Sequence, residues 1–272
     1  MKTLNEKVAV VTGAASGIGR ALAVGLAGEG CALAIADMNE EALNETARMV
    51  SEQGREVMNR TVDVSQRNEV HAFADAVVER YGRVDVVINN AGVTVIEIFE
   101  DFTYDDFEWN MAINFWGVVY GSKAFLPHLM KQPEAHLVNV SSAFGLIGFP
   151  SETAYCASKF GVRGFSEALA RELERTSVAV SCVYPGGVKT NVVRNCRYHK
   201  DWAGRKDKDL AVKEFERIAK KTPEQAARVI IEGIKKKRER ILIGGDAKVI
   251  DIIQRVFPAR YSRVLRMLFR MS

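Results

Sequence analysis

The sequence has few of the side chains that usually build a metal centre or a disulfide framework. Its 272 residues include only four cysteines and four histidines. The histidines do not cluster, and the cysteines show no metal-binding or redox spacing, so we predict no metal site. Free thiols in strand-like or helix-like segments act as small apolar fillers. This pattern favours a reducing compartment, and we expect a cytoplasmic protein.

Long apolar segments are also missing. The sequence has no run of ~18 apolar residues, which argues against a membrane-spanning helix. Residues 1–6 lead into a strand-like segment without a basic and then apolar leader, so we predict no signal peptide. Low-complexity stretches are absent as well, and 47% of the residues are hydrophobic. A chain of this length can bury a sizeable core, and we expect one domain over residues 1–272.

Positive charge is concentrated in one part of the chain. The net charge is +4, yet residues 213–272 hold 16 Lys and Arg against 7 Asp and Glu, so the remainder is mildly acidic. The basic run at 235–238 closes a predicted helix, where cations are solvated and favoured by the helix dipole. We therefore expect no nucleic-acid partner.

Strand-like and helix-like segments alternate along the chain. Most strand candidates are continuous apolar runs, which is typical of parallel strands covered on both faces. They lie at 8–11, 32–36, 57–63, 84–89, 136–140, 178–184 and 240–243, and helical periodicity lies at about 18–30, 40–53, 66–81, 105–131, 155–176 and 223–237. The pattern predicts an α/β fold, a Rossmann-like doubly wound seven-stranded parallel sheet with helices on both faces.

Two segments depart from this alternation. Residues of about 186–215 are polar and unpatterned, and we expect a substrate loop there, with a lid over 202–210. The second segment is a basic amphipathic extension over about 246–272. Its predicted helix has a basic and an apolar face: Arg260, Arg263, Arg266 and Arg270 against Tyr261, Val264, Leu265 and Leu268. Such a helix can lie on an anionic membrane surface, or pack on the body of the protein or on a neighbouring subunit.

A tyrosine and a lysine four residues apart give the clearest indication of chemistry. Tyr155 and Lys159 fall on one face of a predicted helix, where their side chains can interact. A phenol titrates near pH ~10, and an adjacent ammonium lowers that pKa so that the oxygen can exchange a proton at neutral pH. Ser142, thirteen residues before the tyrosine, could hold a carbonyl or alcohol oxygen beside it. These three residues predict a proton-transfer site.

A glycine-rich segment near the amino terminus follows a strand and opens a helix. Residues 12–19 read Thr-Gly-Ala-Ala-Ser-Gly-Ile-Gly. Glycines here permit a tight turn and close approach of a pyrophosphate to backbone N–H groups at the start of the helix. The Gly-x-x-x-Gly-x-Gly spacing differs from the commoner Gly-x-Gly-x-x-Gly, and a glycine cluster can also serve only as a flexible turn. The strand–turn–helix context favours a dinucleotide site.

Together with further motifs, these segments resemble the short-chain dehydrogenase/reductase family over nearly the whole chain. The motifs appear in the family's order: Thr12–Gly19, Asp63-Val64, Asn89–Gly92, Asn114, Ser142, Tyr155-x-x-x-Lys159 and Pro185-Gly186. The resemblance implies an NAD-dependent alcohol dehydrogenase or carbonyl reductase. It also implies that the catalytic residues are Asn114, Ser142, Tyr155 and Lys159. In relatives, the asparagine supports a water that links the lysine to solvent.

The resemblance further implies a nicotinamide cofactor. Besides Tyr155 and Lys159, the residues expected to contact it are Gly13, Ser16, Gly17, Ile18, Gly19, Asp37, Met38, Asp63, Val64, Asn90, Ala91, Gly92, Pro185, Gly186, Val188 and Thr190. Asp37 ends the second strand, where a carboxylate accepts both ribose hydroxyls and repels a 2′-phosphate. Ser16 stands where NADP-binding relatives often carry a basic residue. We expect NAD rather than NADP, although Asp37 could also serve only to cap the next helix.

Two apolar loops indicate the class of substrate. Residues 91–96 and 143–149 follow strands at the edge where ligands bind in such sheets. We expect a hydrophobic secondary alcohol or ketone, although core packing explains the same residues. Two other functions stay open: a sugar-nucleotide epimerase or dehydratase, which shares Tyr-x-x-x-Lys, and an NAD(H)-binding regulator or scaffold without turnover. Relatives are often dimers or tetramers, which implies a homodimer or homotetramer.

Overall fold

The computed structural model of the chain describes residues 1–269. Parts of the predicted amphipathic extension, namely Arg270 and the side chains of Arg266 and Leu268, lie outside the described residues. Within the described residues, none of the helices is both long enough and apolar enough to cross a lipid bilayer.

Seven strands form the main sheet, in the order β3-β2-β1-β4-β6-β7-β9, with every neighbouring pair parallel. They are β1 (Val8–Thr12), β2 (Ala32–Asp37), β3 (Val57–Thr61), β4 (Val86–Asn89), β6 (Ala135–Val140), β7 (Val178–Pro185) and β9 (Arg240–Ile243). The predicted doubly wound parallel sheet is confirmed, although β3 ends two residues before the predicted position 63. The strand order reverses between β1 and β4, and ligands of such sheets bind beyond the carboxyl ends of strands at this point.

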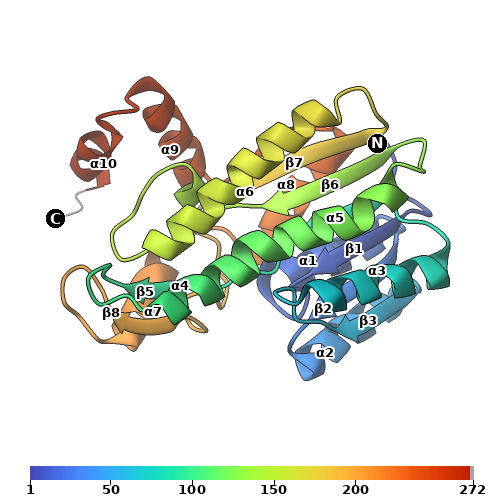
Figure 1. Cartoon of the computed structure of the whole chain (residues 1–272), viewed down its shortest axis with the longest axis horizontal. Helices are drawn as coiled ribbons and strands as arrows, with labels where there is room; N and C mark the ends of the chain where they lie inside the picture. Colours follow the sequence, from blue (N-terminus) through green and yellow to red (C-terminus); the bar gives the residue numbers. More distant parts are fainter. Residues whose placement is uncertain (270–272) are drawn as a thin grey trace.

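Helices cover both faces of the sheet (Figure 1). One face carries α1 (Gly17–Gly28), α2 (Glu40–Ser51) and α8 (Pro223–Lys235), and the other carries α3 (Arg67–Tyr81), α5 (Gly117–Leu129) and α6 (Thr153–Glu172). Each layer buries its own apolar cluster against the sheet. The two clusters hold the strand ends, and therefore the loops that follow them, in fixed positions.

The prediction of one regular helix over 105–131 is wrong. This segment consists of α4 (Tyr104–Met111), a π-helical stretch η1 (Ala112–Trp116) and α5. The extra residue in a π-turn interrupts the usual ladder of hydrogen bonds, and such turns often occur at functional sites. Asn114 lies in the middle of η1 and is fully buried.

The predicted loop at 186–215 contains regular structure that the sequence analysis missed. Strand β8 (Arg197–Lys200) pairs with β5 (Val95–Glu97) in a small parallel sheet, and α7 (Lys208–Ile218) follows. Arg197 stacks over the Trp109 ring at 3.8 Å and pairs with Asp106 at 2.7 Å, which ties β8 to α4. The strand went unrecognised because its four polar residues are stabilised by these distant partners rather than by an apolar pattern. The predicted lid stays a prediction, and Trp202 within it is half exposed.

The carboxyl-terminal extension forms two helices, α9 (Gly245–Val256) and α10 (Tyr261–Phe269), which pack against each other at one end of the molecule (Figure 1). The apolar side of α10 packs on its own chain, where Leu265 is buried beside Ile253 and Ile147. The sequence analysis had left this choice open, and the structure shows contact with the body of the protein.

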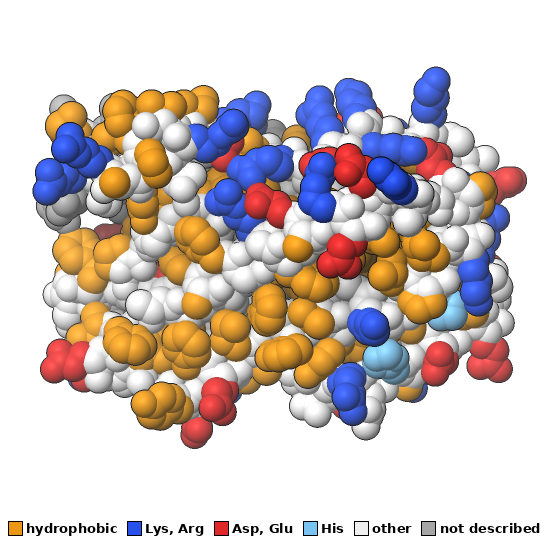
Figure 2. All heavy atoms as spheres, turned by 45° about the horizontal axis from the view of Figure 1, so that its top comes forward, with side chains coloured by type: hydrophobic (Ala, Val, Ile, Leu, Met, Phe, Trp, Pro, Cys, Tyr) orange, Lys and Arg blue, Asp and Glu red, His pale blue; other side chains and the backbone are white. Residues whose placement is uncertain are grey.

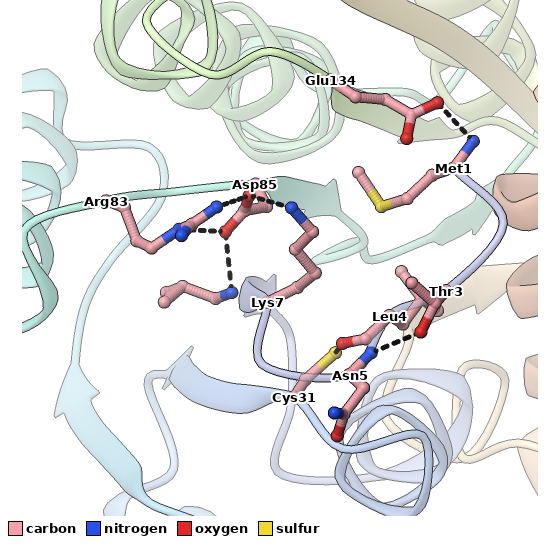
Figure 3. A network of polar contacts seen from close by, with 10 residues as sticks. Met1, Thr3, Leu4, Asn5, Lys7, Cys31, Arg83, Asp85 and Glu134 are labelled. Atoms are coloured by element: carbon pink, nitrogen blue, oxygen red, sulfur yellow. Dashed lines mark hydrogen bonds and ion pairs between the residues drawn. The ribbon is translucent and has the colours of Figure 1, made fainter.

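Ion pairs tie the amino-terminal ends of the strands together (Figure 3). Asp85, just before β4, is fully buried and pairs with Lys7 Nζ at 3.1 Å and Arg83 Nη2 at 2.6 Å. Its other carboxylate oxygen accepts a hydrogen bond from the first backbone N–H of β1, at 3.0 Å. Nearby, the ammonium group of Met1 pairs with Glu134 at 2.7 Å. This edge of the sheet lies opposite the loops described next.

Candidate active site

Tyr155 and Lys159 lie one turn apart near the start of α6, at the carboxyl-terminal edge of the sheet. Lys159 is 3% exposed, and its Nζ donates a hydrogen bond to the carbonyl of Val140, the last residue of β6, at 3.0 Å. The same Nζ lies 5.6 Å from the centre of the Tyr155 ring. The helical spacing therefore brings the two side chains together, and burial removes the Lys159 ammonium group from water, whereas Tyr155 is partly buried.

The pKa of Tyr155 is shifted upward, not downward as its pairing with Lys159 predicts. Burial raises the pKa of the Tyr155 phenol well above its usual value, and an interaction with the Ser142 side chain opposes that rise. Burial also lowers the pKa of the Lys159 ammonium to about 8. In both groups burial disfavours the charged form, because charge is poorly solvated in the protein interior. The sequence shows the spacing of the two residues but not how deeply they are buried.

Ser142 and Ser141 follow β6 and make different contacts. Ser142 caps the short 3₁₀-helix η2 (Ala143–Gly145), and its Oγ accepts a hydrogen bond from the Phe144 N–H at 3.1 Å. Ser141 Oγ donates to the Lys159 carbonyl at 2.8 Å and so fastens β6 to α6. Of these two side chains, only Ser142 interacts with the tyrosine hydroxyl.

Asn114 joins this group from the π-helical segment. Its Nδ2 donates to the Val93 carbonyl at 2.8 Å and to Ser158 Oγ at 3.2 Å, and its Oδ1 accepts from the Val93 N–H at 2.8 Å. A Cβ atom placed on Gly92 would lie 3.1 Å from Asn114 Oδ1 and 3.3 Å from Lys159 Nζ, so the two groups flank this glycine. The four predicted catalytic residues therefore converge. A water relay through Asn114 stays a prediction.

The glycine-rich turn fits closely against the loop that follows β4. Gly13 has a φ of +67°, and a Cβ there would lie 2.7 Å from the Cα of Ala91. A Cβ on Gly19 would overlap the carbonyl oxygen of Gly13. Ser16, the residue before α1, is exposed and its side chain caps no N–H group of the helix. The free N–H groups at this helix start suit the pyrophosphate of a dinucleotide.

A cavity of about 360 Å³ lies beside this turn. It is lined by Ala15, Ser16, Gly17, Arg20, Asp37, Asn39, Ala42, Asn191 and Asn195. The Asp37 carboxylate accepts hydrogen bonds from the Ala15 and Asn39 N–H groups, both at 3.0 Å, and so faces the cavity from the end of β2. This carboxylate, an acceptor for ribose hydroxyls, together with the helix start fits the adenosine half of a nicotinamide dinucleotide.

Arg20 is a cation in this cavity that the sequence analysis did not consider. Its Nη2 donates to the carbonyls of Ala15, at 2.6 Å, and Ala42, at 3.1 Å, and pairs with Glu45 at 2.7 Å. The guanidinium is therefore already engaged by three acceptors. Its position one residue after the last glycine of the turn was the signal that could have revealed it.

Other predicted cofactor residues share this edge of the sheet but have protein partners. The Asn90 side chain donates to the carbonyls of Thr12, at 2.9 Å, and Gly13, at 3.2 Å, and so holds the glycine-rich turn. Asp63 accepts the Ser65 N–H at 2.9 Å just beyond β3. Val64 is buried against the start of α5, whereas the Met38 side chain is 63% exposed.

The segment after β7 lies over the glycine-rich turn. A Cβ placed on Gly17 would lie 3.2 Å from Thr190 Cγ2, which brings 185–190 next to the start of α1. Gly187 donates its N–H to Asp246 of α9 at 2.6 Å, and a Cβ on Gly186 would overlap that carboxylate. Val188 is buried and bridges to Lys221. These predicted cofactor segments thus lie next to one another at the carboxyl-terminal edge of the sheet.

Glu152 is a buried carboxyl group that the sequence analysis missed. It stands three residues before Tyr155, is 8% exposed, and its Oε2 lies 2.5 Å from the hydroxyl of Thr94. Burial raises the pKa of Glu152 to about 8, while the hydrogen bond to Thr94 lowers it. In the sequence, only its position three residues before Tyr155 pointed to a role in the site. An exposed glutamate can stand at the same spacing, so this position does not predict burial. The site therefore holds a third titratable group.

The wall beside the tyrosine is aromatic. The Phe144 ring lies edge-on to the Tyr155 ring at 6.3 Å and stacks on Phe149 at 4.7 Å. Among residues 1–269, no three His, Cys, Asp or Glu side chains are grouped so that they could hold a metal ion. The arrangement can bind a dinucleotide, orient an apolar substrate and transfer a proton.

Comparison with known proteins finds related dehydrogenases and oxidoreductases. Residues 7–201 match the family described as short chain dehydrogenase. SadH of Mycobacterium tuberculosis, a protein named as an oxidoreductase, is 42% identical over 268 residues, which cover 97% of this chain and 96% of that protein. Estradiol 17-beta-dehydrogenase 11 of Rattus norvegicus is 32% identical over 97% of this chain and 84% of its own.

A solved structure shows the same fold. It is a short chain dehydrogenase/reductase from Burkholderia phymatum in complex with NAD, with a TM-score of 0.85 and 32% sequence identity. The match covers 94% of this chain and 95% of the other.

Proposed function

Because the chain belongs to the short-chain dehydrogenase/reductase family of oxidoreductases, whose fold binds a nicotinamide cofactor, we propose that it transfers hydride between NAD(H) and a hydrophobic secondary alcohol or ketone. What supports this most directly is the convergence of Tyr155, Ser142, Lys159 and Asn114 beside the crevice between β1 and β4. The hydride chemistry is supplied by the nicotinamide ring when the cofactor is bound.

In this proposal Tyr155 moves the proton. Its hydroxyl gives a proton to the carbonyl oxygen during reduction and takes one from the alcohol during oxidation. Ser142, which interacts with that hydroxyl, holds the substrate oxygen beside it. Burial raises the pKa of Tyr155, so at neutral pH the phenol carries the proton that it would donate to a carbonyl oxygen.

Lys159 supplies the second titratable group of the proton path. Burial lowers its pKa to about 8, so that it can gain or lose a proton near neutral pH. Its Nζ lies within reach of the Tyr155 ring and beside Gly92, where we place the nicotinamide ribose. Val188 and Thr190 would hold the carboxamide and so fix the orientation of the ring for transfer.

An apolar substrate is favoured by the aromatic wall. Phe144 and Phe149 stack beside Tyr155, and buried Ile147 continues the same loop. One relative of this chain is named as an estradiol dehydrogenase. An aromatic and aliphatic wall beside the proton donor suits a ketone with a large apolar body.

The mechanism is tested by Tyr155→Phe, followed through the absorbance of reduced nicotinamide with a panel of apolar ketones. We expect turnover to fall at least ~10²-fold, because general acid–base catalysis contributes on that scale. Tyr104→Phe, at an 87% exposed tyrosine on α4, is the matched control and should leave the rate unchanged. Near-native rates in the Tyr155 variant would contradict the mechanism. Tight NAD binding without turnover across a broad panel would instead indicate a regulator.

NAD is proposed over NADP because Asp37 presents a carboxylate where a 2′-phosphate would lie. Arg20, the nearby cation, is already engaged by Glu45 and two carbonyls. We expect Asp37→Ser to shift the ratio of kcat/KM values toward NADP by at least about tenfold, since it removes a like charge at close range. Glu41→Ser, an exposed position on α2, is the control. An unchanged ratio would mean that the ribose is recognised elsewhere.

We also propose that residues 1–272 act as one domain in the cytoplasm, as a homodimer or homotetramer. Four buried free thiols are compatible with a reducing compartment. Trp116, the last residue of η1, is 47% exposed and stacks on Tyr120, and Phe160 of α6 is 39% exposed. Exposed aromatic side chains of this kind are enriched in subunit interfaces. Sedimentation of the purified protein measures the subunit number.

A further inference from the structure

The outer face of the two carboxyl-terminal helices is apolar and exposed. Val249, Ile252 and Val256 lie along one side of α9 and are 40%, 61% and 61% exposed. Phe257, which follows α9, is 47% exposed, and Met267 of α10 is 81% exposed. We call these five residues the outer apolar face. In Figure 2, hydrophobic side chains gather at the upper left, where α9 and α10 lie, with basic side chains beside them.

Positive charge surrounds this face. The exposed cations on the same segment are Lys248, Arg255, Arg260 and Arg263. Arg255 lies 3.9 Å from Asp251, and within the described residues the other three take part in no ion pair. Residues 252–269 contain no Asp or Glu at all. The face is therefore both apolar and cationic.

The acidic residues of α9 offset little of this charge, because both point inward and Asp251 lies as far as 3.9 Å from Arg255. Asp246 accepts the Gly187 N–H at 2.6 Å. Asp251 is 5% exposed and pairs with Arg240 at 2.5 Å. The helix thus turns its carboxylates toward the body of the protein and its cations and apolar side chains toward the outside.

The inner side of the two helices is already occupied. Leu265, Ile253 and Ile147 form a buried cluster, and Tyr261 Oη accepts a hydrogen bond from the Gly148 N–H at 3.1 Å. This contact fixes α9 and α10 on the loop that follows Ser142. The outer apolar face cannot turn inward without breaking these contacts, so it stays available to a partner outside the chain.

We propose that α9 and α10 dock the protein on an anionic lipid surface through the outer apolar face and its four cations. Apolar side chains flanked by cations are typical of helices that lie in the membrane interface. A second copy of the chain is disfavoured, since two-fold pairing through this face would bring arginines against arginines. Anionic lipid supplies both an apolar interior and opposite charge.

Docking in this orientation has a consequence that rests on the proposed function. The loop at 143–149, held by Tyr261 and Leu265 on the inner side of the two helices, would lie one helix layer away from the lipid. An apolar ketone concentrates in the membrane rather than in water. The active site would then take its substrate from the lipid phase.

The test is co-sedimentation of the full chain with phosphatidylglycerol-containing vesicles and with pure phosphatidylcholine vesicles. We expect binding to the anionic vesicles that weakens with added salt, because salt screens the attraction. Arg260→Gln combined with Arg263→Gln should lower the partition coefficient about 30-fold, since each cation near such a surface contributes about 1 kcal/mol. Ile252→Ser combined with Val256→Ser should weaken binding to both kinds of vesicle.

Two controls separate docking from other effects. Arg55→Gln combined with Arg67→Gln removes the same charge from exposed positions far along the sequence, and should leave vesicle binding unchanged. Turnover of a water-soluble ketone should be unchanged in all three double variants. This measurement shows that a variant that no longer binds vesicles is still folded and active. No binding to anionic vesicles overturns the proposal, and so does an equal loss in the Arg55 and Arg67 control. A third outcome also overturns the proposal: the parent protein binds no vesicles, and the Ile252 and Val256 substitutions convert an oligomer to a monomer. The outer apolar face would then be an interface with a second copy of the chain.

Discussion

The two edges of the sheet differ in whether their buried charged groups form ion pairs. At the amino-terminal edge, Asp85 is fully buried and surrounded by two cations and a backbone N–H (Figure 3). At the carboxyl-terminal edge, Lys159 and Glu152 are nearly as buried, and among the described residues neither takes part in an ion pair. Paired charges fix the strand ends. Unpaired ones are pushed toward their neutral forms, which lowers stability and brings their pKa values near neutral pH.

The largest effect is expected from breaking the paired edge. Asp85→Ala leaves the Lys7 ammonium, the Arg83 guanidinium and a strand N–H without their acceptor. We expect the free energy of unfolding to fall by about 3–5 kcal/mol, the usual cost of removing one partner from a buried ion pair. Urea unfolding measures this. The kcat of the remaining folded protein should be close to that of the parent, because the proposed active site lies at the other edge.

The unpaired edge should respond in the opposite way. Lys159→Met removes a buried cation and keeps an apolar side chain of similar length. We expect turnover to fall at least ~10²-fold, while the free energy of unfolding stays constant or rises, because no charge remains to be desolvated. Both quantities are measured on the same preparation. A loss of stability like that of Asp85→Ala would show that Lys159 is structural.

The third effect is a change in the pH dependence of stability. Burial raises the pKa of Glu152 to about 8 in the folded protein, above its usual 4.5. Folding therefore favours the protonated acid, and stability should fall as pH rises from 4.5 to about 8, by up to about 1.4 kcal/mol per pH unit. Glu152→Gln cannot ionise and should lose this slope. Melting curves between pH 5 and 8 measure the stability of the parent and of Glu152→Gln. If stability depends on pH in the same way in both proteins, Glu152 is ionised in the folded parent.

Glu134 at the amino-terminal edge is the matched control for this experiment. A hydrogen bond from Lys237, together with the Met1 ammonium, lowers the pKa of Glu134 to about 2. Its contribution to stability is present above pH 4.5 and is lost as pH falls toward 2, the reverse of the Glu152 slope. Glu134→Gln should therefore cost stability at neutral pH, by less than about 1 kcal/mol, since the pair is partly exposed.

Much of the fold could be predicted from the sequence because parallel strands carry continuous apolar runs. The glycine spacing and the Tyr155–Lys159 spacing located the site for a similar reason, since both are local patterns with a physical requirement. Asn114 and Ser142 were assigned to the site through the family resemblance. The structure brings all of these residues to the carboxyl-terminal edge of the sheet.

Features that depend on distant partners were missed. The π-turn around Asn114 leaves the apolar periodicity of the helix intact, so no pattern revealed it. Strand β8 is stabilised by Asp106, which is 91 residues away from Arg197 along the chain. Burial of Tyr155 and Glu152 depends on the loops packed around them, and this determines their pKa values. Sequence spacing carries no information on such desolvation.

The close fit of the glycine-rich turn limits how this protein can be engineered. Side chains added at Gly13 or Gly19 would collide with the neighbouring backbone, whereas the side chain of Ser16 already projects into solvent. Libraries that aim to alter nucleotide preference should therefore vary position 16 and keep the adjoining glycines constant.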